Sequence, residues 1–437
     1  MHITQLGIDV LLQIVAHLDD PKDKFRMAAS WSTWLQTSQE TMEWWANRST
    51  HIRLASRQAV KTFARFCSTH EITTHEANIM IMNDTEQPVL EGAPVVPIGQ
   101  RWALGECVRE FALSLSGTSK FSIETSIGWP KRMGWMTSLQ GLKDLSIITR
   151  SDCEIRGAPL HKLTHVTSLM LLGEACHFGP LMLMFEDRTW ALPPNLRTFH
   201  FHAIAPYHYE LFEAISRLEF LEDLIVDHRA YDQQGDIDVF LHNATCLENL
   251  PIKRLALSFP AVSHLPATIE HFEVINSHAA HNEDFCDFLN TSNQAGNSHL
   301  KSANFSNIGM DIVPSEFRVF TNLQSLNLSK NQVSSFDQRL SNLVNLKHLN
   351  LTSCSLTRVP ESITVFANLR NLILRDNPDL SHYNYDIDYE VLESYGIPHT
   401  HSLDPLEALP NLVYVDLREC GFMSMPANLP RIGFEMD

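Results

Sequence analysis

Apolar and polar residues alternate in a segment that occurs three times near the end of the chain, each copy 23 residues after the last. The copies read LQSLNLSKNQV at 323–333, LKHLNLTSCSL at 346–356 and LRNLILRDNPD at 369–379. In the first copy Leu326 and Leu328 alternate with small polar residues, which is the period of a β-strand with one buried face. The pattern therefore predicts one short strand in each copy.

An asparagine ends the predicted strand of the first copy. The amide of Asn331 can hydrogen-bond to the backbone of its own turn and of neighbouring coils, where the N–H and C=O groups have no strand partner. The following copies carry Cys354, Asn377 and Cys420 at the same place, and each is small enough for a tight interior turn. In the second half of a copy, VPESITVFANL, the pair Val359-Pro360 is expected to turn the chain onto the outer face.

These copies resemble the leucine-rich repeat, LxxLxLxxNxL, and the resemblance implies an α/β solenoid whose curved parallel sheet lines the concave side. Regular copies over residues 300–437 start at Leu300, Leu323, Leu346, Leu369 and, after an insertion, Leu412. A looser LxxLxL rhythm extends the predicted solenoid over 105–437, with starts at Val108, Leu142, Val166, Leu196, Leu221, Ile252 and Ile269. The alternative is a separate α/β domain between residues 105 and 290.

The head of the chain has a different apolar pattern. On a helical wheel of residues 6–18, LGIDVLLQIVAHL, one apolar face lies nearly opposite another. The two faces are Ile8, Leu11, Leu12 and Val15 on one side, and Leu6, Val10 and Ile14 on the other. A surface helix needs only one apolar stripe, so the second face predicts a partner. A second helix is expected from about Pro21, because proline fits the first helical position.

The head resembles the F-box, a three-helix module that docks onto the adaptor subunit of SCF-type cullin-RING ubiquitin ligases. The resemblance implies that these residues bind the adaptor: Leu6, Val10, Leu11, Ile14, Leu18, Pro21 and Trp34. The predicted domains are thus an F-box-like domain over 1–50, a cap and linker over 51–104 and the solenoid. Within the cap, residues 51–70 are expected to be helical and 77–83 a strand. The alternative is an amphipathic cap that shields the first repeat.

An F-box followed by leucine-rich repeats resembles a substrate receptor. The resemblance implies a non-enzymatic substrate-recognition subunit that binds the adaptor and cullin scaffold with its head and a protein substrate with its repeats. The alternative function is an interaction scaffold with no link to ubiquitin. The concave face is expected to bind protein through Asn327, His348, Asn350, Arg375, Tyr414, Asp416 and Arg418. Tyr and Arg anchor interfaces most often, so Arg375, Tyr414 and Arg418 are the predicted anchors.

An insertion over residues 379–404 separates the last two regular copies. It is rich in tyrosine and acidic residues and has no Lys or Arg. One interpretation is a docking loop for a basic segment of the partner, with contacts from Tyr383, Tyr385, Asp386, Asp388, Tyr389 and Glu390. The other is a tolerated surface elaboration, since added loop length costs little stability.

Composition excludes several classes of protein. The net charge of −18 repels phosphate backbones and anionic lipid surfaces, so we expect neither nucleic acid nor membrane as a partner. The eight cysteines are scattered singly, and no apolar stretch has membrane-spanning length, which favours the cytoplasm or nucleus. His70 and His75 lie about 140° apart on a helical wheel, so they cannot share a zinc ion as in HExxH. We expect no cofactor or metal.

Overall fold

The computed structural model describes thirteen stretches of the chain, which are residues 50–54, 76–81, 118–125, 134–149, 160–173, 192–203, 208–228, 247, 249–258, 265–275, 299–381, 402–422 and 432–436. The chain divides into two compact units. Unit 1 comprises residues 1–196 and 203–206, and unit 2 comprises residues 197–202 and 207–437. The predicted F-box residues and the predicted binding residues of the insertion lie outside the described part.

Unit 1 contains parallel strands, and each pairs with the next in chain order. They are β1 (Thr50–Leu54), β2 (Glu76–Ile81), β3 (Lys120–Thr125), β4 (Asp144–Thr149) and β5 (Ser168–Gly173), with 3-10 helices η2 (Gly134–Ser138) and η3 (Leu160–Lys162). The strand expected near 77–83 is confirmed by β2. The helix expected over 51–70 is wrong at its start, because residues 51–54 belong to β1.

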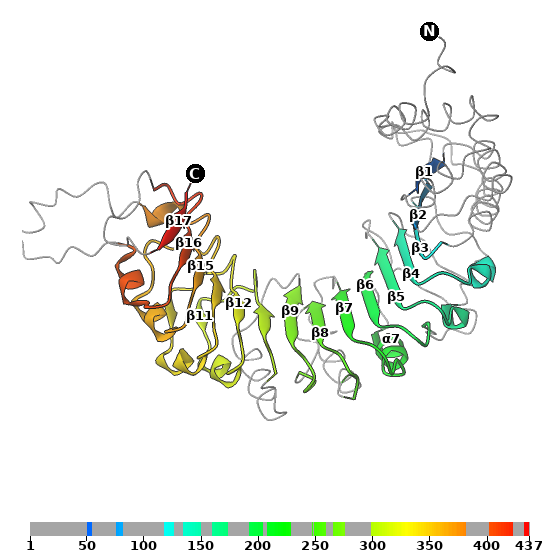
Figure 1. Ribbon diagram of the computed structural model, residues 1–437, viewed down its shortest axis with the longest axis horizontal. Helices are drawn as coiled ribbons and strands as arrows, with labels where there is room; N and C mark the ends of the chain where they lie inside the picture. The colour runs from blue at the N-terminus through cyan, green and yellow to red at the C-terminus, as the bar shows by residue number, and fades with distance from the viewer. Residues whose placement is uncertain are drawn as a thin grey trace, which may run out of the picture. The chain divides into compact units, whose positions relative to one another are not determined.

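Unit 2 contains a second series of strands that lie side by side in chain order (Figure 1). They are β6 (Thr198–Ala203), β7 (Asp223–His228), β8 (Arg254–Ser258), β9 (His271–Ile275), β10 (Ser302–Asn304), β12 (Ser325–Asn327), β14 (His348–Asn350), β15 (Asn371–Ile373), β16 (Tyr414–Asp416) and β17 (Gly433–Glu435). Neighbours from β7 to β17 pair in parallel. The predicted parallel sheet is confirmed.

The strands of the irregular region continue directly into those of the regular repeats. His271 of β9 pairs with Ser302 of β10, which pairs with Ser325 of β12. Residues 207–290 fall in the same compact unit as the regular repeats. The alternative of a separate α/β domain reaching residue 290 is therefore wrong for this part of the chain.

The segments between the strands carry short helices. In unit 2 these are α7 (His208–Ile215), η5 (Ser315–Val319), η6 (Gln338–Asn342), η7 (Glu361–Val365), η8 (Pro378–Leu380) and η10 (Asp404–Ala408), with a two-stranded parallel sheet of β11 (Ile312–Val313) and β13 (Ser335–Phe336). Pro360 is the N-cap of η7 with φ −59°, so the turn expected at Val359-Pro360 is confirmed. Its fixed φ suits that position.

The core of unit 2 lies between the sheet and these outer segments. Leu326, Leu328, Leu349 and Leu351 are at most 1% exposed, as the alternating pattern predicts. Phenylalanine rings fill the outer half of the coils, with Phe305 against Phe317 and Phe336 against Phe366, each pair at 5.1 Å between centroids. Burial of large rings stabilises each coil against its neighbour. The opposite side of each strand is left to form the concave face.

Candidate functional site

The concave face is held in shape by buried asparagines at the turn after the strand. The Asn331 side chain accepts hydrogen bonds from the backbone N–H groups of Ile308 and Met310 in the preceding coil. Its Nδ2 donates to the carbonyls of Phe305 and Leu328. Asn377 repeats the arrangement two coils further along, accepting from Cys354 and Leu356. The predicted role of Asn331 is confirmed.

Register places the concave side chains in rows across the strands of unit 2. The strand-start row is Asp223, Arg254, His271, Ser302, Ser325, His348, Asn371, Tyr414 and Gly433. The strand-end row is Ile225, Ala256, Glu273, Asn304, Asn327, Asn350, Ile373, Asp416 and Glu435. The predicted residues Asn327, His348, Asn350, Tyr414 and Asp416 therefore belong to one contiguous surface.

Asparagines of the strand-end row also end their own strands. The Oδ1 atoms of Asn304, Asn327 and Asn350 accept from the backbone N–H two residues later, at 2.9 to 3.1 Å. Asp416 does the same with Arg418 at 3.1 Å. Such local bonds compete with the strand ladder at the ends of these strands. No hydrogen bond occupies Nδ2 of Asn327 or Asn350 in the described part, so both amides keep a donor for a ligand.

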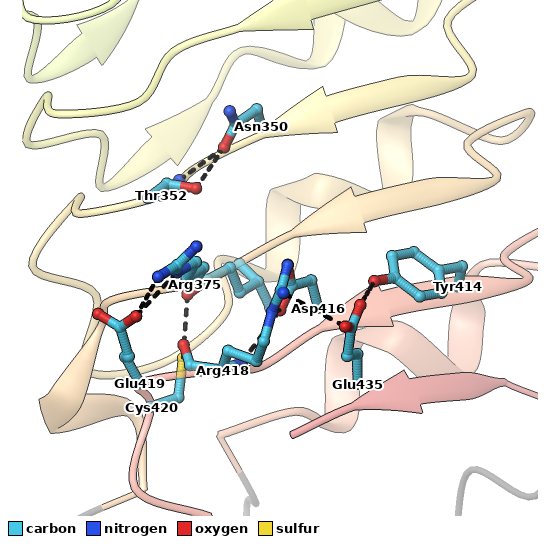
Figure 2. Close-up of polar contacts among 10 residues, drawn as sticks. Asn350, Thr352, Arg375, Tyr414, Asp416, Arg418, Glu419, Cys420 and Glu435 are labelled. Atoms are coloured by element: carbon cyan, nitrogen blue, oxygen red, sulfur yellow. Dashed lines mark hydrogen bonds and ion pairs between the residues drawn. The ribbon is translucent and has the colours of Figure 1, made fainter. Parts of the chain in front are cut away.

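A cluster of charged residues occupies the last coils (Figure 2). We define the C-terminal charge cluster as Arg375, Tyr414, Asp416, Arg418, Glu419 and Glu435. Arg418 pairs with Asp416 Oδ2 at 2.6 Å and Glu435 Oε1 at 3.2 Å, while Arg375 pairs with Glu419. The Tyr414 hydroxyl donates to Glu435. These pairs fix the three predicted anchors in place before any partner arrives.

The cluster also changes the acidity of its members. Hydrogen bonding to Glu435, aided by burial, raises the pKa of Tyr414 to about 12, so the phenol keeps its proton as a donor. Burial alone would raise the pKa of Asp416, but hydrogen bonds from Arg418 outweigh it and hold that pKa below its usual value. The bond to Asp416 raises the pKa of Arg418 further. Both ions thus keep their charges near neutral pH.

Four predicted positions differ from the structure. Asp416 was expected to face outward, but it is 3% exposed because Arg418 covers it. Ser329 continues the alternation of β12 and is therefore expected on the same exposed side, but it is 8% exposed because it lies in the turn after β12. Arg375 and Arg418 lie two residues beyond the ends of β15 and β16, so they extend from turns instead of strands.

Sequence reasoning missed a histidine–carboxylate group on the concave side of β6 and β7. His202 Nδ1 contacts Asp227, and His200 Nε2 lies 3.9 Å from Asp223 Oδ1. The alternation of HFH over 200–202 predicts two exposed positions around a buried Phe201. Phe201 is indeed buried, but both histidines are only half-buried and each faces a carboxylate. The alternation of DLIVD over 223–227 could have indicated the pairing.

A second asparagine ladder was also missed. The Nδ2 groups of Asn345, Asn368 and Asn411 each donate to a backbone carbonyl of the preceding coil, which are those of Thr321, Val344 and Ala367. Asn195 makes the same bond to Thr164 in unit 1. The signal was the Asn-Leu pair at the start of the copies that follow the first regular one, and only its leucine was used.

These observations decide the fold. Parallel strands recur every 23 residues from β10 to β15, buried Asn or Cys side chains fill the turn position at 331, 354 and 377, and phenylalanine rings pack in the outer segments. The described part of the chain is a leucine-rich-repeat solenoid.

Comparisons with known proteins add context to this fold. No family model and no curated protein matches the chain. An internalin from Listeria monocytogenes is 14% identical to this chain with a TM-score of 0.42. The match covers 93% of this chain and 92% of the internalin chain. TLR13 in a complex with ssRNA13 is 15% identical with a TM-score of 0.46, and 85% of this chain covers 50% of that one. The leucine-rich-repeat domain of the type III effector XopL is 16% identical with a TM-score of 0.29, covering 50% of this chain and 70% of that one. The fold assignment therefore rests on the repeat geometry.

Within the described residues no group of three or more His, Cys, Asp or Glu is arranged to hold a metal ion. In the same part of the chain, no helix is both long and apolar enough to cross a membrane. Cys354 and Cys420 are buried and form no disulfide.

Proposed function

We propose that this chain is a non-catalytic substrate-recognition subunit of an SCF-type cullin-RING ubiquitin ligase. Its concave face binds a protein substrate, and residues 6–45 bind the adaptor that connects it to the cullin scaffold. The C-terminal charge cluster is the observation that supports protein binding, because its Tyr and Arg side chains are exposed or half-exposed and already fixed. Fixed side chains lose little entropy on binding.

The adaptor half of the proposal is supported by the F-box-like pattern of the head. Residues 6–18 carry two apolar faces, and a module this small has no core for both of them. A partner that covers the second face gives the module the buried area it lacks. In this proposal the protein works in the cytoplasm or nucleus, where such ligases act, and needs no cofactor.

The test is co-purification of the adaptor and cullin with the full chain expressed in cells. We expect both to accompany the wild type and to be lost in Val10→Asp, because a carboxylate buried at an interface without a partner costs about 1–3 kcal/mol or more. Thermal unfolding of the solenoid should not change, since the substituted face is free until the adaptor binds.

The matched control is Leu12→Asp on the opposite face of the same helix, which should unfold the head as well as abolish adaptor binding. Absence of the adaptor from wild-type preparations would leave the scaffold function without a ubiquitin link. In that case both substitutions should destabilise the first repeats, as expected for an amphipathic cap.

A further inference from the structure

A row of side chains runs along the edge of unit 2 where the strands begin. We call it the edge row, and its members are Arg197, Glu222, Lys253, Glu270, Lys301, Gln324, Lys347, Arg370 and Val413. The backbone N–H of each member donates to the carbonyl of the previous one, at 2.7 to 2.9 Å. Each residue is therefore the direct neighbour of the next.

The first half of the edge row alternates in charge and is paired. Glu222 binds both Arg197 and Lys253, at 2.9 and 3.3 Å. Glu270 binds Lys301 at 2.6 Å, and this contact lowers the pKa of the Glu270 carboxyl. Every cation in this half has a carboxylate from a neighbouring coil.

The alternation stops at Gln324. The next two members, Lys347 and Arg370, are both cations, and neither has an ion pair or side-chain hydrogen bond in the described part of the chain. Like charges on directly neighbouring strands destabilise a sheet. A glutamate at either position would restore the pattern of the first half. The fold alone therefore gives no reason for two adjacent unpaired cations on a protein whose net charge is −18.

Apolar and hydrogen-bonding groups surround these two cations. We define the basic corner as Lys347, Arg370 and Val413 of the edge row with His348, Asn371 and Tyr414 of the strand-start row. Val413 is 60% exposed, which is the highest value among the large hydrophobic residues of the described part. Asn371 Nδ2 lies 2.9 Å from His348 Nδ1. The corner thus combines two free positive charges, an exposed aliphatic side chain and part of an aromatic ring.

We propose that the basic corner binds an acidic, extended segment of a partner protein that also carries an aliphatic residue. The partner's carboxylates pair with Lys347 and Arg370, and its aliphatic side chain packs on Val413 and the ring of Tyr414. The main support for the proposal is charge complementarity, because the partner's carboxylates supply the negative charges that Lys347 and Arg370 lack in the edge row. It deepens the protein-binding half of the proposed function and does not depend on the adaptor.

The test measures binding of a fluorescent peptide made of glutamate, leucine and serine, with a second peptide that has glutamine in place of glutamate. Anisotropy at low salt should show that the wild type binds the acidic peptide and not the neutral one. Arg370→Gln should lower the affinity for the acidic peptide by about tenfold, because one good charge contact at the interface is lost. Binding should also weaken as the salt concentration rises.

Arg197→Gln is the matched control, because it removes one charge from the same edge where that charge is already paired. It should leave peptide affinity within about twofold, since a distant exposed charge is screened by salt. Arg370→Glu provides a stability readout. It should abolish peptide binding and leave the unfolding temperature unchanged or raise it by up to about 2 °C, because it creates the missing pair with Lys347.

Equal binding of the acidic and neutral peptides, or full affinity in Arg370→Gln, would overturn the proposal. A different result would be that a single-stranded oligouridylate binds in an Arg370-dependent way and the acidic peptide does not. In that case the ligand of the basic corner would be a nucleic acid and the proposal would be wrong. These outcomes are independent of adaptor co-purification, which Arg370→Gln should not alter. A failure here is therefore distinguishable from a failure of the ubiquitin-ligase role.

Discussion

At the scale of single residues, the turn position of each coil shows how one side chain can serve a solenoid. Asn377 bonds to backbone groups of two coils, accepting from Cys354 and Leu356 and donating to Leu351 and Leu374. Cys354 occupies the same position one coil earlier and donates weakly to Leu328 at 3.3 Å. Burial raises the pKa of its thiol, and the N–H groups of Asn331 and Val333 meet only the sulfur. Sulfur is a weak acceptor, so this turn is less well satisfied.

A reciprocal exchange tests this difference. We expect Cys354→Asn to raise the free energy of unfolding by about 0.5–1.5 kcal/mol, because an amide oxygen replaces sulfur as acceptor of two buried N–H groups. Asn377→Cys should lower it by a similar or larger amount. Chemical denaturation followed by circular dichroism measures both. A loss of stability in both variants would show that packing volume, not hydrogen bonding, decides at this position.

The same residues show what the sequence can and cannot predict. The role of Asn331 follows from its place after an alternating strand, because a buried turn needs a side chain that both donates and accepts. The partners of Arg375 and Arg418 do not follow, since they depend on which turn residues of neighbouring coils come close. Burial of Asp416 escapes prediction for the same reason: Arg418, two residues later, folds back over it.

At the scale of elements, strand starts were predicted well where an aliphatic residue stands two positions before the strand. Leu142, Val166, Leu196, Leu221, Ile252 and Ile269 all precede strands in this way. Strand β3 was missed because buried Thr118 takes that position, so the LxxLxL rhythm is absent. A threonine that fills a leucine site is invisible to a pattern of apolar residues.

The stability of strand β16 is expected to depend on pH through Asp416. The pKa of Asp416 is lowered in the folded state, so its contribution to stability is present above its unfolded pKa of about 3.9 and is lost as pH falls through the lower folded value. Asp416→Asn should therefore unfold about 2–4 °C lower than the wild type at neutral pH and show a shallower loss of stability below about pH 4. Thermal unfolding between pH 7 and 3 measures this.

The control for this prediction is Glu361→Gln, which breaks the i,i+3 ion pair between Arg358 and Glu361. The Glu361 side chain is 78% exposed. An exposed pair of this kind contributes little, so its pH dependence should follow that of the wild type. If Asp416→Asn and the wild type lost stability in parallel down to pH 3, the Asp416 carboxyl would titrate alike in the folded and unfolded states, which would contradict the lowered pKa.

At the scale of the whole molecule, the solenoid tolerates a long insertion without losing register. Leu374 and Asp376 donate to the carbonyls of Asp416 and Arg418 across the insertion, at 2.9 and 3.0 Å. Lys330 and Ser353 make the equivalent bonds between regular coils, at 2.8 and 2.9 Å. The step between Leu369 and Leu412 thus joins two coils as closely as a 23-residue step does. The sheet therefore keeps its register across the insertion.

The last prediction uses this tolerance to separate two surfaces of opposite charge. Replacing residues 383–400 with a short glycine-serine linker should leave the unfolding temperature within about 2 °C, because loop closure depends only weakly on length. The replacement removes four acids, Asp386, Asp388, Glu390 and Glu393, and no Lys or Arg. If the insertion docks a basic segment of the partner, a lysine-rich peptide that binds the wild type at low salt should no longer bind. Unchanged binding of that peptide would make the insertion a surface elaboration. The acidic peptide should still bind the basic corner, since Lys347, Arg370 and Val413 are all retained, so the two peptides report on the two surfaces independently.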